Sequence, residues 1–191
     1  MDPCRAPPNA PVFWLPHEDT SVVVLAAEPE VLTIGAESHS PLSNLSSIVD
    51  GQGVHSLYDL DTFQKIQILR VDTAVRDAPL AAVVPLDITG FDRLEAVSRL
   101  LAVLHGRAIP PDTRLTRQQR ARARRMLQAF DGAREGASQR EIAQVIFHVG
   151  PISRDEWQAS STRHAVMSLL RDARALIAGG YRKLLRHRHR R

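Results

Sequence analysis

Apolar residues in the first half of the chain occur in short runs of the kind that form strands. The β-branched run from Ser21 to Ala27 stops at Glu28-Pro29, which predicts a buried strand closed by a turn. Polar and apolar residues alternate from Gln64 to Val71, the period of a half-buried strand. Ala81 to Leu86 is its expected partner, with a turn at residues 77–79 and with Pro85 favouring a sheet edge.

From Thr89 onward the apolar positions follow helical spacing instead. Thr89 and Asp92 predict a capping box that opens a helix, and Gly106 is expected to end this helix just after His105. Its buried face is expected to consist of the apolar residues that recur every three or four positions. These are Leu94, Val97, Leu101 and Leu104.

Further helix starts are marked by a hydroxyl residue with an amide or carboxylate three positions later, at Thr116, Ser138 and Ser153. A last long helix is expected from Ser160 or Ser161 to Ala178, closed by Gly179-Gly180. One apolar side per helix predicts the core: Ala123, Met126, Leu127 and Phe130; Ile142, Ala143, Ile146 and Phe147; Trp157; and Val166, Leu169, Leu170, Ala173 and Ile177.

These patterns predict an α+β fold, with a small N-terminal strand-containing region and a helix followed by an all-helical helix-turn-helix domain. We expect residues 1–19 to be a flexible N-terminal arm and residues 20–108 an α+β region for regulation or assembly. Residues 109–185 are the expected helix-turn-helix DNA-binding domain, and residues 186–191 a basic tail. The joint at Ile109-Pro110-Pro111-Asp112 marks the boundary, because the charge changes sign there.

Charge separates along the same boundary. Residues 1–106 carry 6 Lys and Arg against 14 Asp and Glu, whereas residues 107–191 carry 19 against 7. Clustered guanidinium groups bind phosphate by displacing condensed counterions, so the basic half is expected to meet a polyanion. The planar fork of Arg suits phosphate and guanine, although arginine-rich usage equally fits a GC-rich genome.

The polar side of the last helix carries side chains suited to a major groove. We expect His164, Ser168 and Arg171 to read base edges, because Arg forks onto guanine while Ser and His donate or accept. Phosphate contacts are expected where amides, hydroxyls and cations gather near helix ends. These residues are Ser138, Gln139, Arg140, Arg163, Arg174, Tyr181, Arg182 and Lys183, with the tail from Arg186 to Arg191 as a further phosphate contact or minor-groove arm.

Other interpretations of the same surface stay open. An exposed face in an arginine-rich protein can be a solvated face that binds no nucleic acid, and the tail can be a disordered, membrane-surface or RNA-binding extension. Gly51-Gln52-Gly53 predicts a turn rather than a phosphate cradle, and neither a Gly-x-Ser-x-Gly nor a His-Glu-x-x-His motif occurs, so we expect no enzyme.

Cysteine and histidine usage argues against a metal or a cofactor. Cys4 is the single cysteine, so it cannot form a disulfide or a cysteine-based zinc site within one chain. His187 and His189 lack further ligands, and neither a metal nor another cofactor is expected. No apolar run approaches the ~20 residues of a membrane span, and the first residues lack a signal-peptide core, which predicts a cytoplasmic protein.

The helical half resembles a known family. The string from Gly136 to Ala143, Trp157, Arg171 and the run from Ala178 to Arg182 are similar to a proteobacterial domain of unknown function. That family is associated with the DNA-binding domain of type VI secretion transcription factors. Related members regulate excision and transfer of integrative and conjugative elements, as activators or as antiactivators that bind the activator instead of DNA. The similarity is clearest over residues 115–185.

We therefore expect a bacterial transcription regulator that binds double-stranded DNA and controls a secretion system or mobile-element transfer. A homo-oligomer is expected, because many helix-turn-helix proteins are symmetric. The alternative is an antiactivator that binds a partner regulator protein instead of DNA, and a third hypothesis is an RNA-binding module.

Overall fold

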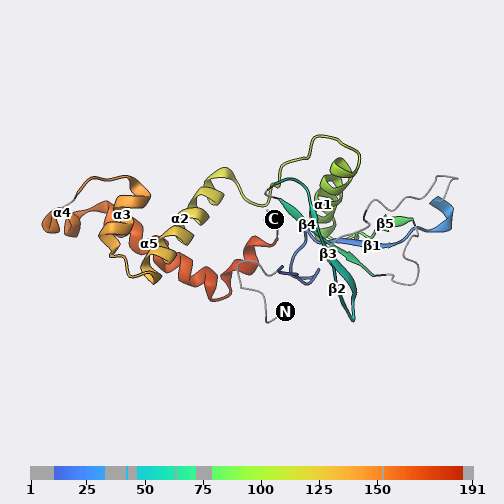
Figure 1. The fold of residues 1–191 in the computed structure, drawn as a ribbon, viewed down its shortest axis with the longest axis horizontal. Helices are drawn as coiled ribbons and strands as arrows, with labels where there is room; N and C mark the ends of the chain where they lie inside the picture. Colours follow the sequence, from blue (N-terminus) through green and yellow to red (C-terminus); the bar gives the residue numbers. More distant parts are fainter. Residues whose placement is uncertain are drawn as a thin grey trace. The chain divides into compact units, whose positions relative to one another are not determined.

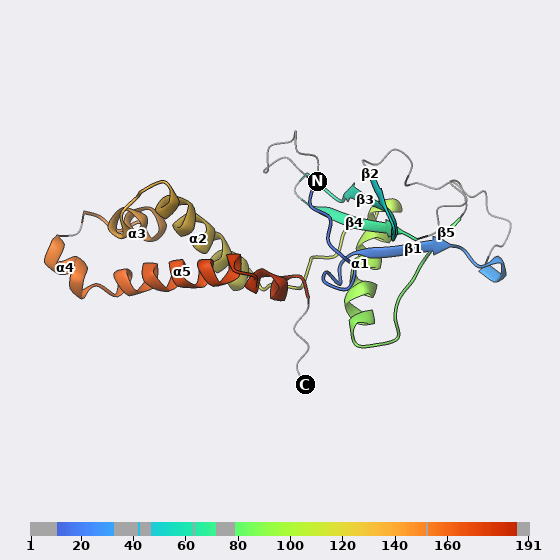
Figure 2. The ribbon, with the colours of Figure 1, turned by 90° about the horizontal axis from the view of Figure 1, so that it is seen from below.

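The computed structural model describes residues 11–32, 42, 47–62, 64–71, 79–151 and 153–186, and the chain divides into two units (Figures 1 and 2). The first unit joins Met1–Asp112 to Leu185–Arg191, and the second is Thr113–Leu184. The first unit holds a five-stranded sheet, while the described part of the second is helical, so the predicted α+β fold is confirmed. Cys4, residues 77 and 78 of the predicted turn, and residues 187–191 lie outside the described residues.

A mixed sheet in the order β2-β3-β4-β1-β5 builds the first unit. β1 runs parallel to β4, and the other neighbouring strands are antiparallel. The predicted strands within Ser21 to Ala27 and Gln64 to Val71 are confirmed. The strands are β1 (Val23–Ala27), β2 (Ser47–Asp50), β3 (Gly53–Asp59), β4 (Lys65–Arg70) and β5 (Leu80–Ala82).

The predicted pairing of Ala81 to Leu86 with the strand at Gln64 to Val71 is wrong. β5 pairs with β1 instead and ends at Ala82, before Pro85. The neighbours of β4 in the sheet are β1 and β3. β3 follows the confirmed turn at Gly51-Gln52. The apolar pattern did not predict β3, because two of the residues that it buries, His55 and Ser56, are polar.

β4 is buried on both faces, unlike the half-buried strand that its alternation predicts. Ile66 and Ile68 join the core cluster beneath the helix of this unit, and Gln67 faces the other way. The Trp14 N–H donates to Gln67 Oε1 at 2.7 Å, and Gln67 Nε2 donates to the Trp14 carbonyl at 2.8 Å. Because both ends of its amide are paired, the Gln67 side chain can be buried.

α1 (Thr89–Leu104) packs against one face of this sheet (Figure 1). Its predicted end is confirmed, since His105 is the C-cap and Gly106 adopts a φ of 61°. The predicted capping box is wrong, because Thr89 already belongs to the helix. Both the N–H and the hydroxyl of Thr89 donate to Asp87 Oδ1, whereas Asp92 is buried.

The predicted buried face of α1 is right for two of its four residues. Val97 and Leu104 pack against the core of the sheet as predicted, whereas Leu94 and Leu101 are 53% and 48% exposed. Ala96 and Leu100 lie on the inward face in their place.

Two arginines occupy that inward face. Arg93 and Arg99 are only 8% and 5% exposed. Arg93 donates to the carbonyls of Val22 and Pro16 at 2.9 and 2.6 Å. Arg99 donates to the Pro110 carbonyl at 3.2 Å and to a side-chain amide oxygen on the sheet side. Since these carbonyls satisfy the guanidinium groups, Arg can occupy positions where hydropathy alone predicts Leu.

The chain that follows the helical unit completes the first unit. Both the N–H and the hydroxyl of Thr20 donate to the Leu185 carbonyl, joining residues 165 positions apart. Arg186 donates to the carbonyls of Glu18 and His17. Residues 185 and 186 therefore belong with the first unit, although they follow the second in the chain.

The second unit is built from α2 (Arg117–Arg134), α3 (Gln139–Phe147), α4 (Arg154–Ala159), α5 (Ser161–Ile177) and a short 3-10 turn, η3 (Gly180–Leu184). The predicted capping boxes at Thr116, Ser138 and Ser153 are confirmed, as is Ser160 as the N-cap of α5.

The core of the second unit follows the predicted stripes with two exceptions. Leu127 and Ile177 are exposed. On α2 the fully buried Ala129 packs in the core in place of Leu127, and on α5 Leu176 packs in place of Ile177. The buried cluster is Met126, Ala129, Ile142, Ala143, Ile146, Val166, Leu169, Leu170 and Ala173.

Candidate nucleic-acid interface

The side of α5 opposite its buried stripe is polar. His164 and Arg171 are exposed there, and Ser168 is half-buried between them. Their spacing of four and three residues keeps them on one side of the helix over two turns. Ser160 caps the end of α4 and the start of α5, and its Oγ accepts the Thr162 N–H at 3.0 Å. This single connecting residue fixes the start of α5.

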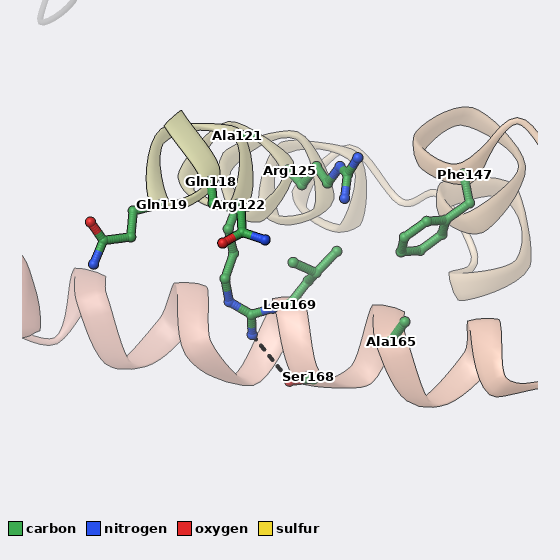
Figure 3. Close-up of a pocket in the computed structure, with 9 residues that line it drawn as sticks. All are labelled: Gln118, Gln119, Ala121, Arg122, Arg125, Phe147, Ala165, Ser168 and Leu169. Carbon is green, nitrogen blue, oxygen red and sulfur yellow. Dashed lines mark hydrogen bonds between the residues drawn. The ribbon is translucent and has the colours of Figure 1, made fainter. Parts of the chain in front are cut away.

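Ser168 and Arg171 belong to a hydrogen-bond network that ties α5 to α2. Figure 3 shows the bond of this network between Arg122 and Ser168. Arg122 of α2 donates to Asp172 Oδ2 at 2.5 Å and to Ser168 Oγ at 3.4 Å. Arg171 donates to Asp172 Oδ1 at 3.1 Å and to Ser168 Oγ at 3.3 Å. One carboxylate and one hydroxyl thus hold the same two guanidinium groups.

Asp172 is the only acidic residue of α5. Hydrogen bonds from Arg122 first, and from Arg171 second, lower the pKa of Asp172, so its carboxylate is charged at neutral pH. The side chains of Arg122 and Arg171 are 52% and 76% exposed. Exposed ion pairs stabilise a fold little, so the main effect of this network is to fix where the two guanidinium groups point.

A groove of about 570 Å³ lies between α2 and α5, with Phe147 of α3 at one end (Figure 3). We call it the α2–α5 groove. Arg122 and Arg125 contribute the positive charge, and Arg125 has no hydrogen-bond or ion-pair partner in the described part of the chain. The other lining residues are Gln118, Gln119, Ala121, Ala165, Ser168 and Leu169.

The start of α3, where a phosphate contact was predicted, already carries a carboxylate. Ser138 Oγ accepts the Glu141 N–H, and the Ser138 N–H donates to Glu141 Oε2 at 2.7 Å. Hydrogen bonds from the hydroxyl and then the N–H of Ser138 lower the pKa of Glu141. Ser138 does not line the α2–α5 groove, and it lies nine residues, or about 13 Å along the helix, from Phe147, which does.

The remaining predicted phosphate contacts are distributed around α5 and η3. Arg174, Arg182 and Lys183 are exposed, and Tyr181 is half-buried. Arg163 is half-buried and donates to a carbonyl near the end of α4 at 3.3 Å. The structure thus gathers His164, Ser168 and Arg171 on one helix side, while the predicted phosphate contacts extend to both ends of that helix.

The sequence patterns did not indicate Arg122, Arg125 or Asp172 as part of this surface. A signal exists on α2, where Gln118, Arg122 and Arg125 recur at spacings of four and three residues and so share one side. Nothing in the spacing shows that this side meets α5, because the contact joins residues 50 positions apart.

Within the described residues, no helix is both long and apolar enough to cross a membrane, and no three His, Cys, Asp or Glu side chains converge to hold a metal ion. Residues 83–186 match the sequence model of a family described as T6SS transcription factor, DNA-binding domain. The match includes α1 and the whole second unit. No curated protein and no solved structure matches the chain.

Proposed function

The chain belongs to the family of T6SS transcription factor DNA-binding domains, and on that premise we propose that it is a bacterial regulator that reads duplex DNA with α5. The observation that carries the proposal is the division of α5, which buries Val166 and Leu169 while exposing His164 and Arg171. A helix anchored by one apolar side can present its polar side to a major groove. In this proposal α3 and α4 precede α5 in a helix-turn-helix arrangement.

His164, Ser168 and Arg171 are the proposed base-reading residues. The Ser168 hydroxyl accepts from both Arg122 and Arg171, so both of its lone pairs are engaged and its O–H remains to donate to a base. Arg171 has five N–H donors, of which Ser168 and Asp172 use only part, and the rest suit the O6 and N7 atoms of guanine.

The proposed phosphate contacts surround this reading helix. They are Arg163, Arg174, Tyr181, Arg182 and Lys183 around α5 and η3, and Ser138, Gln139 and Arg140 at the start of α3. At α3 the Glu141 carboxylate occupies the cap, so the side chains of Gln139 and Arg140 are the better phosphate ligands there. We propose that the first unit serves regulation or assembly, that the protein acts as a homo-oligomer in the cytoplasm, and that it controls a secretion system or mobile-element transfer.

The test is a titration with duplex DNA from the region upstream of the protein's own gene and with a random duplex, at two salt concentrations. Arg171→Ala is expected to lower the affinity for the preferred duplex by roughly tenfold and to relax sequence choice. Arg182→Ala is expected to weaken both duplexes alike and to reduce the salt slope by about 1. Equal losses on both duplexes for both variants would contradict this division of roles.

A second candidate function is an antiactivator that binds a partner regulator instead of DNA. The observation in its favour is a set of exposed apolar side chains on the second unit, namely Leu127, Val145, Met167 and Ile177. A stable complex with a second regulator, together with no DNA binding at low salt, would favour this function over DNA reading.

A further inference from the structure

We propose that the α2–α5 groove binds a backbone phosphate of the duplex that α5 reads, with Arg125 as the phosphate ligand and Arg122 beside it. This inference rests on the proposed function and extends the DNA interface from α5 to α2.

The chemistry of the groove matches a nucleic-acid strand. Arg122 and Arg125 supply cations and Gln118 an amide, and all three come from one side of α2. Ala165 of α5 and Phe147 of α3, both half-buried, supply apolar surface. A DNA strand alternates an anionic phosphate with a largely apolar sugar, so both kinds of lining have a counterpart on one strand.

Continuity with the reading helix favours DNA as the occupant. Ser168 lines the groove and also stands between His164 and Arg171 on the polar side of α5. A duplex seated on that side of α5 is therefore brought directly to the edge of the groove.

The dimensions agree with this placement. A major groove is about 12 Å wide, so a helix inside it has a phosphate backbone on each side. Packed helices lie about 8–10 Å apart. α2 packs on α5 through the buried cluster that includes Met126 and Leu169. When α5 lies in the DNA major groove, α2 therefore lies over one of the two phosphate backbones that border it.

The two arginines differ in their readiness to bind. Arg122 is held by Asp172 and Ser168, as the dashed line in Figure 3 shows for Ser168. Arg125 lines the same groove and has no partner among the described residues, so its full set of donors is available to a phosphate. Arg125 is therefore the residue to change.

The experiment compares Arg125→Ala with Arg124→Ala in the full chain. Arg124 is the neighbouring exposed arginine on α2 and does not line the groove, so both variants lose the same charge from the same helix. Binding is measured by fluorescence anisotropy with a duplex enriched by the wild-type protein from a random library and with an unselected duplex, over a salt series.

Arg125→Ala is expected to reduce the slope of log K against log salt by about 0.9 and to weaken both duplexes by about eightfold at 0.1 M salt. The ratio between the two duplexes should stay unchanged, because a phosphate contact carries no base information. Arg125→Lys should keep most of the slope, and Arg124→Ala should keep all of it.

Equal slopes for Arg124→Ala and Arg125→Ala, with wild-type binding intact, would overturn the groove assignment and leave the proposed function standing. A change in the ratio between duplexes for Arg125→Ala would overturn it as well, since Arg125 would then read bases. Absence of wild-type binding to either duplex at low salt would overturn both the groove and the proposed function.

Discussion

Arginine has opposite surroundings in the two units. In α1, Arg93 and Arg99 are buried and donate mostly to backbone carbonyls. In the second unit, Arg122 and Arg171 are exposed and share one carboxylate. Carbonyls around a buried guanidinium make it a structural element that no ligand can reach, whereas a surface carboxylate orients a guanidinium and leaves donors for a ligand. The partners of an arginine, more than its presence, separate a structural role from the binding role proposed for Arg171 and Arg122.

The largest expected effect comes from a buried arginine. Arg93→Ala should lower the free energy of unfolding of the first unit by about 3 kcal/mol, because the buried Val22 carbonyl and the half-buried Pro16 carbonyl lose a charged donor. Denaturant titration measures the loss, and hydrogen exchange should place it in β1 and α1, with α5 protected as before. Arg134→Ala, on the exposed end of α2, is the control and should behave as wild type. If Arg93→Ala were as stable as wild type, the hydrogen bonds of Arg93 would not stabilise the first unit, and the structural role assigned to the buried arginines would be wrong.

A smaller effect is expected at the cap of α3. Ser138→Ala should cost about 1 kcal/mol, because Ser138 Oγ satisfies the Glu141 N–H. Ser138 also lowers the pKa of Glu141. The ionised Glu141 carboxylate therefore stabilises the fold at pH values above its pKa in the unfolded chain, and this stabilisation is lost as pH falls through its lower pKa in the folded chain.

The pH dependence gives that prediction a matched internal control. In Ser138→Ala the pKa of Glu141 should rise toward its ordinary value, while the pKa of Glu156, lowered by the backbone and then the hydroxyl of Ser153, should not move. NMR titration of the two carboxyl groups measures both. A shift in the pKa of Glu156 would show that the two capping boxes are coupled. An unchanged pKa of Glu141 would show that Ser138 does not set it.

The smallest effect on stability, and the sharpest test of the binding role, is expected at Asp172. Asp172→Asn leaves one acceptor oxygen for Arg122 and Arg171, and the surface pairs add little to folding. Affinity for random duplex should rise, since an anion leaves the face of α5. The preference for the enriched duplex should fall, since Arg171 loses its fixed direction. A parallel rise on both duplexes would mean that Asp172 only repels phosphate and positions nothing.

Local features of this fold were predictable from the sequence, and partners across the sheet were not. The cap at Ser138 and the end of α1 at Gly106 depend on residues within a few positions of each other, which a pattern records. The pairing of β5 with β1 and the burial of Arg93 depend on groups more than 50 positions away. Periodicity predicts which residues share a side, and it does not say what that side meets.

The candidate site divides in the same way. His164, Ser168 and Arg171 are found on one side of α5 by spacing alone. Arg122 and Asp172 lie 50 positions apart, and their pairing follows only from the packing of α2 on α5. Spacing places Arg125 on the same side of α2 as Gln118 and Arg122, but it does not show that this side lines a groove.

The bonds of Leu185 and Arg186 to Thr20, Glu18 and His17 impose an order on biosynthesis. A ribosome delivers residues 17–20 early and residues 185 and 186 only after the last residue of the helical unit. Helices with nearby partners fold quickly and can form as they emerge, whereas a contact across 165 positions must wait for its second half. The unit whose synthesis starts first is therefore the one completed last, because residues 17–20 lack these hydrogen bonds until residues 185 and 186 have been made.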